Sequence, residues 1–67
     1  MYQNQIRKRR EAMGLSQSRL AHLIGIAEPN LSALELGKRE PWPKVRRALA
    51  EALGICEKEL FPGDSER

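Results

Sequence analysis

The segment Glu28-Pro29-Asn30 combines a carboxylate, a proline and a side-chain amide within three residues, in the stretch GIAEPNLSA. A carboxylate accepts hydrogen bonds and an amide both accepts and donates them, so these side chains suit recognition of a polar partner. Catalysis fits less well, because Ser16 and His22 point to different helix faces at their spacing and form no plausible triad with Glu28. One His and one Cys cannot build a zinc site. The sequence therefore favours a binding domain without a metal or other cofactor over an enzyme.

The composition is that of one small folded domain with a single core: 67 residues, 40% hydrophobic and 31% charged. The apolar runs are too short to cross a membrane, and no apolar stretch follows the charged N-terminal segment as it would in a signal peptide. A single cysteine, Cys56, rules out an intrachain disulfide and is typical of a reducing cytoplasm. We therefore expect a cytoplasmic domain with no membrane segment.

The charge is distributed unevenly along the chain, whose net value is +3. Residues 51–67 contain five acidic and two basic residues, whereas residues 1–50 contain ten basic and four acidic ones. This asymmetry indicates a polyanionic partner for the basic part of the molecule. The alternative is that the RKRR run at 7–10 is only a solvated helix face.

Glycines punctuate the chain at positions 14, 25, 37 and 54, each directly after a stretch with helical periodicity. A glycine in this place commonly adopts the left-handed conformation that ends a helix. No segment has the period-two alternation of a strand, so the fold class is all-α. The punctuation predicts five helices, over about residues 3–13, 17–24, 28–36, 43–53 and 57–61. We assign residues 1–61 to the domain and 62–67, PGDSER, to a flexible tail.

Two residues predict how the second and third helices begin. Ser16 is a suitable N-cap for the second helix, because its hydroxyl can accept a hydrogen bond from a free backbone N–H. The residue before a proline avoids the α region, so Glu28 is expected as the N-cap of the third helix and Pro29 as its first residue. An acid at the positive end of a helix dipole is also favourable, which is enough to explain Glu28 by stability alone.

The apolar stripe of the first helix, Tyr2, Ile6 and Met13, is interrupted where Arg10 stands. Glu35 likewise adjoins inward-facing leucines of the third helix. Two half-buried charges of opposite sign on neighbouring helices need each other, so we predict an ion pair between Arg10 and Glu35. The remaining apolar positions at helical spacing are assigned to the core: Leu20, Ala21, Ile24, Leu31, Leu34, Val45, Leu49, Ala52, Leu53, Leu60 and Phe61.

Residues 17–36, QSRLAHLIGIAEPNLSALEL, have the pattern of two short helices joined by a tight turn. Ala21 is small where the two helices must approach closely, and Gly25 permits a positive φ at the turn. Apolar residues occupy the positions that the two helices would share as an interior. This is the helix-turn-helix pattern, whose second helix enters the major groove of DNA.

The chain resembles the lambda-repressor-like or Xre-type helix-turn-helix domains, which include the phage repressors and Cro proteins, over residues 4–61. The resemblance rests on RKRREAMGLSQSRLAHLIGI, on LSALELGKREP and on RRALAEALGICEKELF. It implies a compact five-helix DNA-binding domain that acts as a homodimer on a palindromic operator in transcription regulation. Pro29 departs from the family, which commonly has a polar residue such as Gln at one of the first two recognition positions, so base preference does not carry over.

The beginning of the third helix is the part of such a domain that meets base edges. Glu28 can accept a hydrogen bond from cytosine N4, and Asn30 can pair with adenine N6 and N7. Pro29 or Ala33 can contact a thymine methyl group, and Ser32 can contact a base or a phosphate. Because phosphates repel a carboxylate, we interpret Glu28 as a determinant of specificity rather than of affinity.

The resemblance places Ser16 and Gln17, at the start of the second helix, near a DNA phosphate, and helix N-terminal amides do suit an anion. Lys38 and Arg39, after the third helix, would contact the backbone as well. The alternatives are a capping or solvated Gln17 and a solvated turn at Lys38 and Arg39. Trp42, where the family usually has a small hydroxyl residue, is expected to pack on the fourth helix rather than against a phosphate or a partner chain.

A domain that recognises about four base pairs cannot find one operator in a genome, so a homodimer is expected. Ile55, Leu60 and Phe61 are the candidates for the dimer contact, with Leu23 and Leu36 as second candidates; the alternative is that Leu60 and Phe61 only close the core. The expected function is that of a repressor. The competing hypothesis is a protein-binding module of the same fold, such as a toxin-neutralising antitoxin or a bridging factor.

Overall fold

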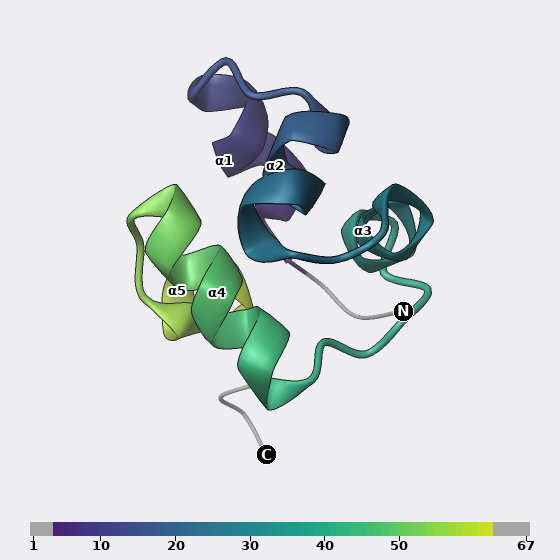
Figure 1. The fold of residues 1–67 in the computed structure, drawn as a ribbon. Coiled ribbons are helices and arrows are strands. Elements are labelled where there is room, and N and C mark those ends of the chain that lie inside the picture. The colour runs from purple at the N-terminus through teal and green to yellow at the C-terminus, as the bar shows by residue number, and fades with distance from the viewer. Residues whose placement is uncertain (1–3, 63–67) are drawn as a thin grey trace.

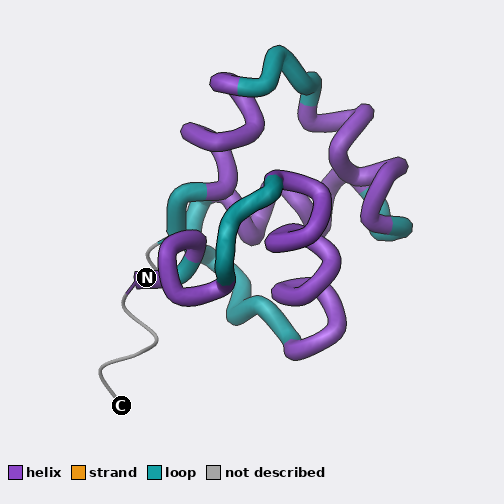
Figure 2. Tube along the Cα trace, turned by 90° about the vertical axis from the view of Figure 1, so that its left-hand side faces the viewer, coloured by secondary structure: helices purple, strands orange, loops and turns teal. Residues whose placement is uncertain are grey.

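Five helices make up the part of the chain that the structure, a computed structural model, describes, namely residues 4–62. They are α1 (Ile6–Ala12), α2 (Gln17–Ile24), α3 (Glu28–Glu35), α4 (Pro43–Leu53) and α5 (Glu57–Leu60). Short loops join the helices around a common interior (Figure 1), and residues 4–62 contain no strand (Figure 2). The predicted all-α class and the five helices are therefore confirmed. No helix in this part of the chain is long and apolar enough to cross a membrane.

The predicted helix ends depend on glycines that adopt a left-handed conformation. Gly25 ends α2 with φ 76° and Gly54 ends α4 with φ 70°. The Gly25 N–H donates to the Ala21 carbonyl over 2.9 Å, and the next N–H, of Ile26, donates to the same carbonyl over 3.0 Å. The chain thus satisfies the end of α2 while turning sharply toward α3.

The core is built from apolar residues of all five helices. Ile6 of α1, which is fully buried, lies among them, but Met13 keeps 53% of its surface exposed. The prediction for Met13 was wrong: Met13 is the C-cap at the end of α1, where helical backbone geometry does not ensure that the side chain packs on the core. Tyr2 lies outside the described residues. The buried residues are Ile6, Leu20, Ala21, Leu31, Leu34, Val45, Leu49, Leu53, Leu60 and Phe61.

The N-terminal segment holds α3 and α5 together. The Gln5 N–H donates to the Leu60 carbonyl, and Asn4 Nδ2 donates to the Leu34 carbonyl, each over 2.8 Å. Leu60 is fully buried and Phe61 is 2% exposed. Neither side chain can therefore meet a second subunit, which corrects their assignment as dimer contacts and supports the alternative that they close the core. Ile55 is half-buried and keeps some surface.

The start of α3 differs from the prediction by one residue. Ala27 is the N-cap, with φ −70° and ψ 143°, so Glu28 is the first helical residue and Pro29 the second. The expectation that Glu28 would cap the helix was wrong because a proline loses no hydrogen bond at either of the first two positions, where no backbone N–H has an intrahelical acceptor. The conformational preference of the residue before proline is too weak to exclude a helical Glu28.

Candidate nucleic-acid interface

The two helices of the predicted helix-turn-helix pack against each other across the turn after Gly25. Leu20 and Ala21 of α2 and Leu31 and Leu34 of α3 are buried, so both helices bury one face in the shared interior. The opposite face of α3 is left at the side of the molecule (Figure 1). The packing therefore anchors α3 by one face and leaves its other face at the surface.

The residues proposed for base contacts lie on the accessible part of α3. Glu28 and Pro29 are exposed, and the other three candidates, Asn30, Ser32 and Ala33, are partly exposed. All five come from the first two turns of one helix, so a single surface can engage one partner with all of them. A carboxylate, an amide and a hydroxyl offer the donors and acceptors that base edges require.

The N-terminus of α2 is capped as predicted. Ser16 Oγ accepts a hydrogen bond from the Arg19 N–H over 3.0 Å. Gln17 Nε2 donates to Glu35 Oε1 over 3.2 Å, a contact that its sequence position does not indicate. Gln17 and Ser32, from different helices, line the same surface hollow of about 350 Å³. The structure therefore brings a candidate backbone contact and a candidate base contact into one site.

The predicted pair of Arg10 and Glu35 is present and buried. Arg10 Nε donates to Glu35 Oε2 over 2.7 Å and Nη2 donates to Oε1 over 3.2 Å, while the two side chains are only 11% and 3% exposed. Arg10 Nη1 also donates to the Leu15 carbonyl over 2.8 Å. One guanidinium therefore ties α1 to the end of α3 and to the loop before α2.

The hydrogen bond to Glu35 raises the pKa of Arg10, against the opposing effect of burial. Because the pKa of this cation is raised on folding, its stabilising contribution is complete below the ordinary arginine pKa. The contribution is lost only as the pH rises through the raised value, far above neutrality. Arg10 therefore stays charged within the pair at neutral pH and well above it.

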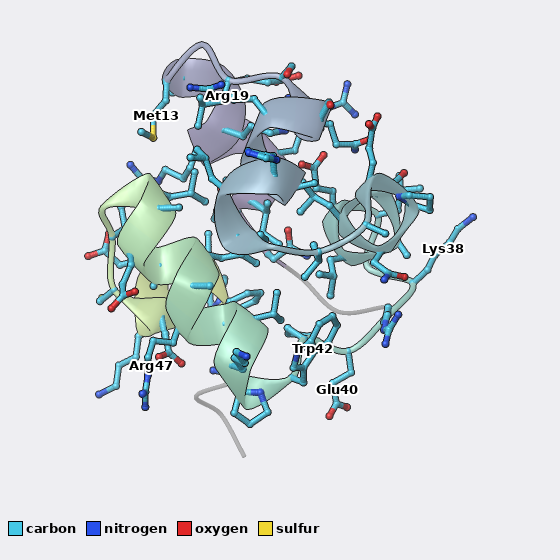
Figure 3. The ribbon with its side chains drawn as sticks, in the orientation of Figure 1. Met13, Arg19, Lys38, Glu40, Trp42 and Arg47 are labelled. Carbon is cyan, nitrogen blue, oxygen red and sulfur yellow. The ribbon has the colours of Figure 1, made fainter. Side chains whose placement is uncertain are left out.

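The loop between α3 and α4 carries the basic residues proposed for backbone contacts. Lys38 and Arg39 are exposed, and Lys38 extends away from the molecule beyond α3 (Figure 3). Arg39 is oriented on two sides: its Nη1 donates to Asn30 Oδ1 over 2.9 Å, and its Cζ lies 4.7 Å from the centre of the Trp42 ring. Trp42 packs on the core, as expected.

Sequence reasoning missed these contacts of Arg39. A hydrogen bond between residues nine apart, across a loop, leaves no periodic signal. The only clue is an arginine three residues before a tryptophan that has a proline on each side.

The acidic C-terminal part of the molecule neutralises some of the basic surface. Glu59 of α5 lies 3.7 Å from Arg9 of α1, and Glu57 lies 3.4 Å from Arg46 of α4. The acidic residues near the C-terminus thus form ion pairs with basic residues of other helices, away from the exposed face of α3.

Among residues 4–62 no group of three or more His, Cys, Asp or Glu is arranged to hold a metal ion.

Several known proteins have sequences similar to this chain. Residues 6–61 match the model of the helix-turn-helix family. The SPbeta prophage-derived uncharacterized HTH-type transcriptional regulator YonR of Bacillus subtilis is 33% identical over 63 residues, which cover 94% of this chain and 58% of YonR. The uncharacterized HTH-type transcriptional regulator YqaE of Bacillus subtilis is 32% identical over 65 residues, 97% of this chain and 56% of YqaE. The chain thus spans somewhat more than half the length of these relatives.

A solved structure has a similar fold along most of its length. The restriction-modification controller protein C.AhdI from Aeromonas hydrophila is 38% identical, with a TM-score of 0.79 over 85% of this chain and 86% of that one. The sequence match and the similarity of fold therefore indicate the same family. The chain belongs to the helix-turn-helix family, in its lambda-repressor or Xre type, a family of DNA-binding domains found in transcriptional regulators.

Proposed function

We propose that this chain is the DNA-binding domain of a transcriptional repressor, which binds a palindromic double-stranded operator as a homodimer with α3 in the major groove. The observation that carries the proposal is the contrast between the two ends of α3. Its last residue, Glu35, is buried in an ion pair, whereas its first residues, Glu28 and Pro29, are exposed. A helix fixed at one end and accessible at the other can enter a groove without losing its orientation.

The exposed end of α3 supplies the proposed base contacts. Glu28 accepts from cytosine N4, and Pro29 and Ala33 contact thymine methyl groups. Ser32, beside the hollow that Gln17 also lines, contacts a base or the adjoining phosphate. Asn30 faces the groove from the same turn, with its Oδ1 already bonded to Arg39. Base recognition is thus concentrated on about two turns of helix.

Contacts with the DNA backbone orient α3 in this proposal. The capped N-terminus of α2 presents backbone amides and Gln17 to one phosphate, with Ser16 at the cap. Lys38, extended beyond the end of α3, contacts a second phosphate from the loop. Because each neutralised phosphate releases counterions, binding should weaken steadily as the salt concentration rises.

Dimer formation requires a surface that is accessible in each subunit. Ile55 is half-buried and remains a candidate, together with the exposed Leu23 and Leu36. Two copies whose α3 helices are about 34 Å apart would enter successive major grooves on one side of a duplex. The operator should therefore have two-fold symmetry and half-sites about one helical turn apart.

Selection of bound duplexes from a random pool tests this proposal directly. The bound pool should converge on two symmetric half-sites, and the mass of the complex should correspond to two chains per duplex. The logarithm of the binding constant should fall linearly with the logarithm of the salt concentration. A bound pool that remains random after repeated selection at moderate salt would contradict sequence-specific DNA binding.

A protein-binding module, such as an antitoxin or bridging factor, is the second candidate function. Its support is the exposure of three large apolar side chains, Met13, Leu23 and Leu36. Exposed apolar surface commonly marks protein contacts. A binding constant for duplex DNA that does not change with salt would favour this candidate, because it would mean that phosphates contribute little.

A further inference from the structure

Arg39 is held beside the first turn of α3 by a neutral partner. Its Nη1 donates to Asn30 Oδ1 over 2.9 Å, and Asn30 is the third residue of α3. Arg39 has no carboxylate partner among residues 4–62. An amide orients a guanidinium without cancelling its charge, whereas a carboxylate such as Glu35 does both. The positive charge of Arg39 therefore remains available to an external acceptor.

The side chain is also supported from its other side. The Arg39 guanidinium lies over the Trp42 ring, with Cζ 4.7 Å from the ring centre. Trp42 is itself packed on the core and stands in an extended conformation, with φ −87° and ψ 159°, between Pro41 and Pro43. The two prolines restrict the backbone around the ring. Stacking on a fixed ring lowers the rotameric freedom that Arg39 would lose on binding.

The contacts of Arg39 leave an edge of the guanidinium available. Arginine has five N–H donors in a planar fork, and Asn30 engages one nitrogen while Trp42 covers a face. Two parallel N–H groups match the O6 and N7 acceptors of guanine in the major groove. A phosphate can also accept from such a fork. The location of Arg39 favours guanine over phosphate, because its guanidinium is bonded to the first turn of α3, the part that meets base edges. The neighbouring Lys38, in contrast, extends away from α3.

Resting on the proposed function, we propose that Arg39 is a specificity-determining residue that recognises a guanine in each half-site, and that Asn30 and Trp42 position it. This assignment changes two roles. Arg39 contacts a base instead of the DNA backbone, and Asn30 orients Arg39 instead of contacting an adenine. The loop after α3 thereby extends the recognised sequence beyond the bases that the helix itself contacts.

The test uses the operator obtained by selection and the complete set of its single-base variants. Affinities are measured at constant salt by competition, for the wild-type protein and for Arg39→Lys, Asn30→Ala and the double variant. Arg39→Lys keeps the positive charge but removes the planar fork. Arg47→Lys, the same change on an exposed residue of α4 on the opposite side of the molecule from Lys38 (Figure 3), is the matched control. Thermal unfolding of each variant verifies that it is folded.

The wild-type protein should prefer guanine at one position of each half-site by roughly 5- to 150-fold, the range of a bidentate contact. Arg39→Lys should lose most of this preference and leave the salt slope unchanged, and Arg47→Lys should leave the preference intact. Asn30→Ala should reduce the preference at the same position, and the double variant should lose no more than Arg39→Lys alone, because the two residues act as one unit.

Three results would overturn the assignment. An equal loss of affinity for all duplexes in Arg39→Lys, with base preferences preserved, would make Arg39 a phosphate contact. A change at a different position in Asn30→Ala would make Asn30 a base contact of its own. A selective wild-type protein with no preference for guanine would also overturn it. A wild-type protein that prefers no base at any position would instead refute the proposed function itself.

Discussion

Glutamates stand at both ends of α3, and their surroundings are opposite. The Glu35 side chain is 3% exposed and accepts hydrogen bonds from Arg10 and Gln17, at distances between 2.7 and 3.2 Å. Glu28, in the first turn of the same helix, is exposed. The two residues have the same functional group, so the difference between them arises from position alone.

This difference separates folding from recognition within one helix. A buried carboxylate that already accepts three hydrogen bonds is committed to the fold, and its removal leaves a charge uncompensated in the interior. An exposed carboxylate contributes little to stability but can meet a base edge. Substitutions at the two ends should therefore affect different measurements.

The largest effect is expected for Glu35→Gln, which keeps the shape of the side chain and removes its charge. Arg10 would remain buried without a counterion, so the free energy of unfolding should fall by about 3–5 kcal/mol. That is a large part of the total expected for a small domain. Urea denaturation monitored by circular dichroism measures the loss.

Replacement of both partners serves as the control for this experiment. Arg10→Met combined with Glu35→Leu should recover much of the lost stability, because no buried charge remains. A loss of less than about 1 kcal/mol in Glu35→Gln would mean that water reaches the pair and that α3 is not fixed by it.

Glu28→Ala should have the converse effect. The free energy of unfolding should change by less than about 1 kcal/mol, since only a favourable interaction with the helix dipole is lost. The base preference at one operator position should change by roughly 1–3 kcal/mol, measured by competition between single-base variants of the operator. Equal losses of affinity for all sequences would restrict Glu28 to a role in helix stability.

The parts of the fold that local chemistry determines could be predicted from the sequence. Glycines at positions 14, 25, 37 and 54 all have positive φ, as their places after helical stretches indicate. Ser16 caps α2 because a hydroxyl before a helix can bond to a free N–H. The pair of Arg10 and Glu35 could be predicted because Arg10 stands where the helical spacing requires an apolar residue and Glu35 adjoins inward-facing leucines.

The parts that depend on three-dimensional packing could not be predicted in the same way. Leu60 and Phe61 fit both the core and a surface for a partner in the sequence, and only the packing shows that α5 and the residue after it bury both side chains against the rest of the chain. Glu28 is helical because the first turn tolerates proline at more than one position. The hydrogen bond from Arg39 to Asn30 depends on the course of a whole loop, which no spacing rule describes.

Lys38→Ala should have a smaller effect than either glutamate substitution, and it should be the same for every sequence. If Lys38 contacts a phosphate, its loss weakens binding to all duplexes alike and reduces the slope of log K against log salt by about one. Fluorescence anisotropy titrations at four or more salt concentrations measure the slope. A change confined to one base position would instead indicate that Lys38 lies in the groove.

The smallest effect is expected for Glu11→Gln, the matched counterpart of Glu35→Gln. Glu11 Oε2 lies 3.2 Å from Arg7 Nε, and the side chains of Arg7 and Glu11 are 68% and 56% exposed. The side chains of Arg10 and Glu35 are only 11% and 3% exposed. Water solvates both charges whether or not they pair, so the free energy of unfolding should change by less than about 0.5 kcal/mol in urea denaturation. If Glu11→Gln and Glu35→Gln lower the free energy of unfolding equally, burial does not control the strength of these ion pairs. The proposed contrast between a buried, structural end of α3 and an exposed, recognising end would then be wrong.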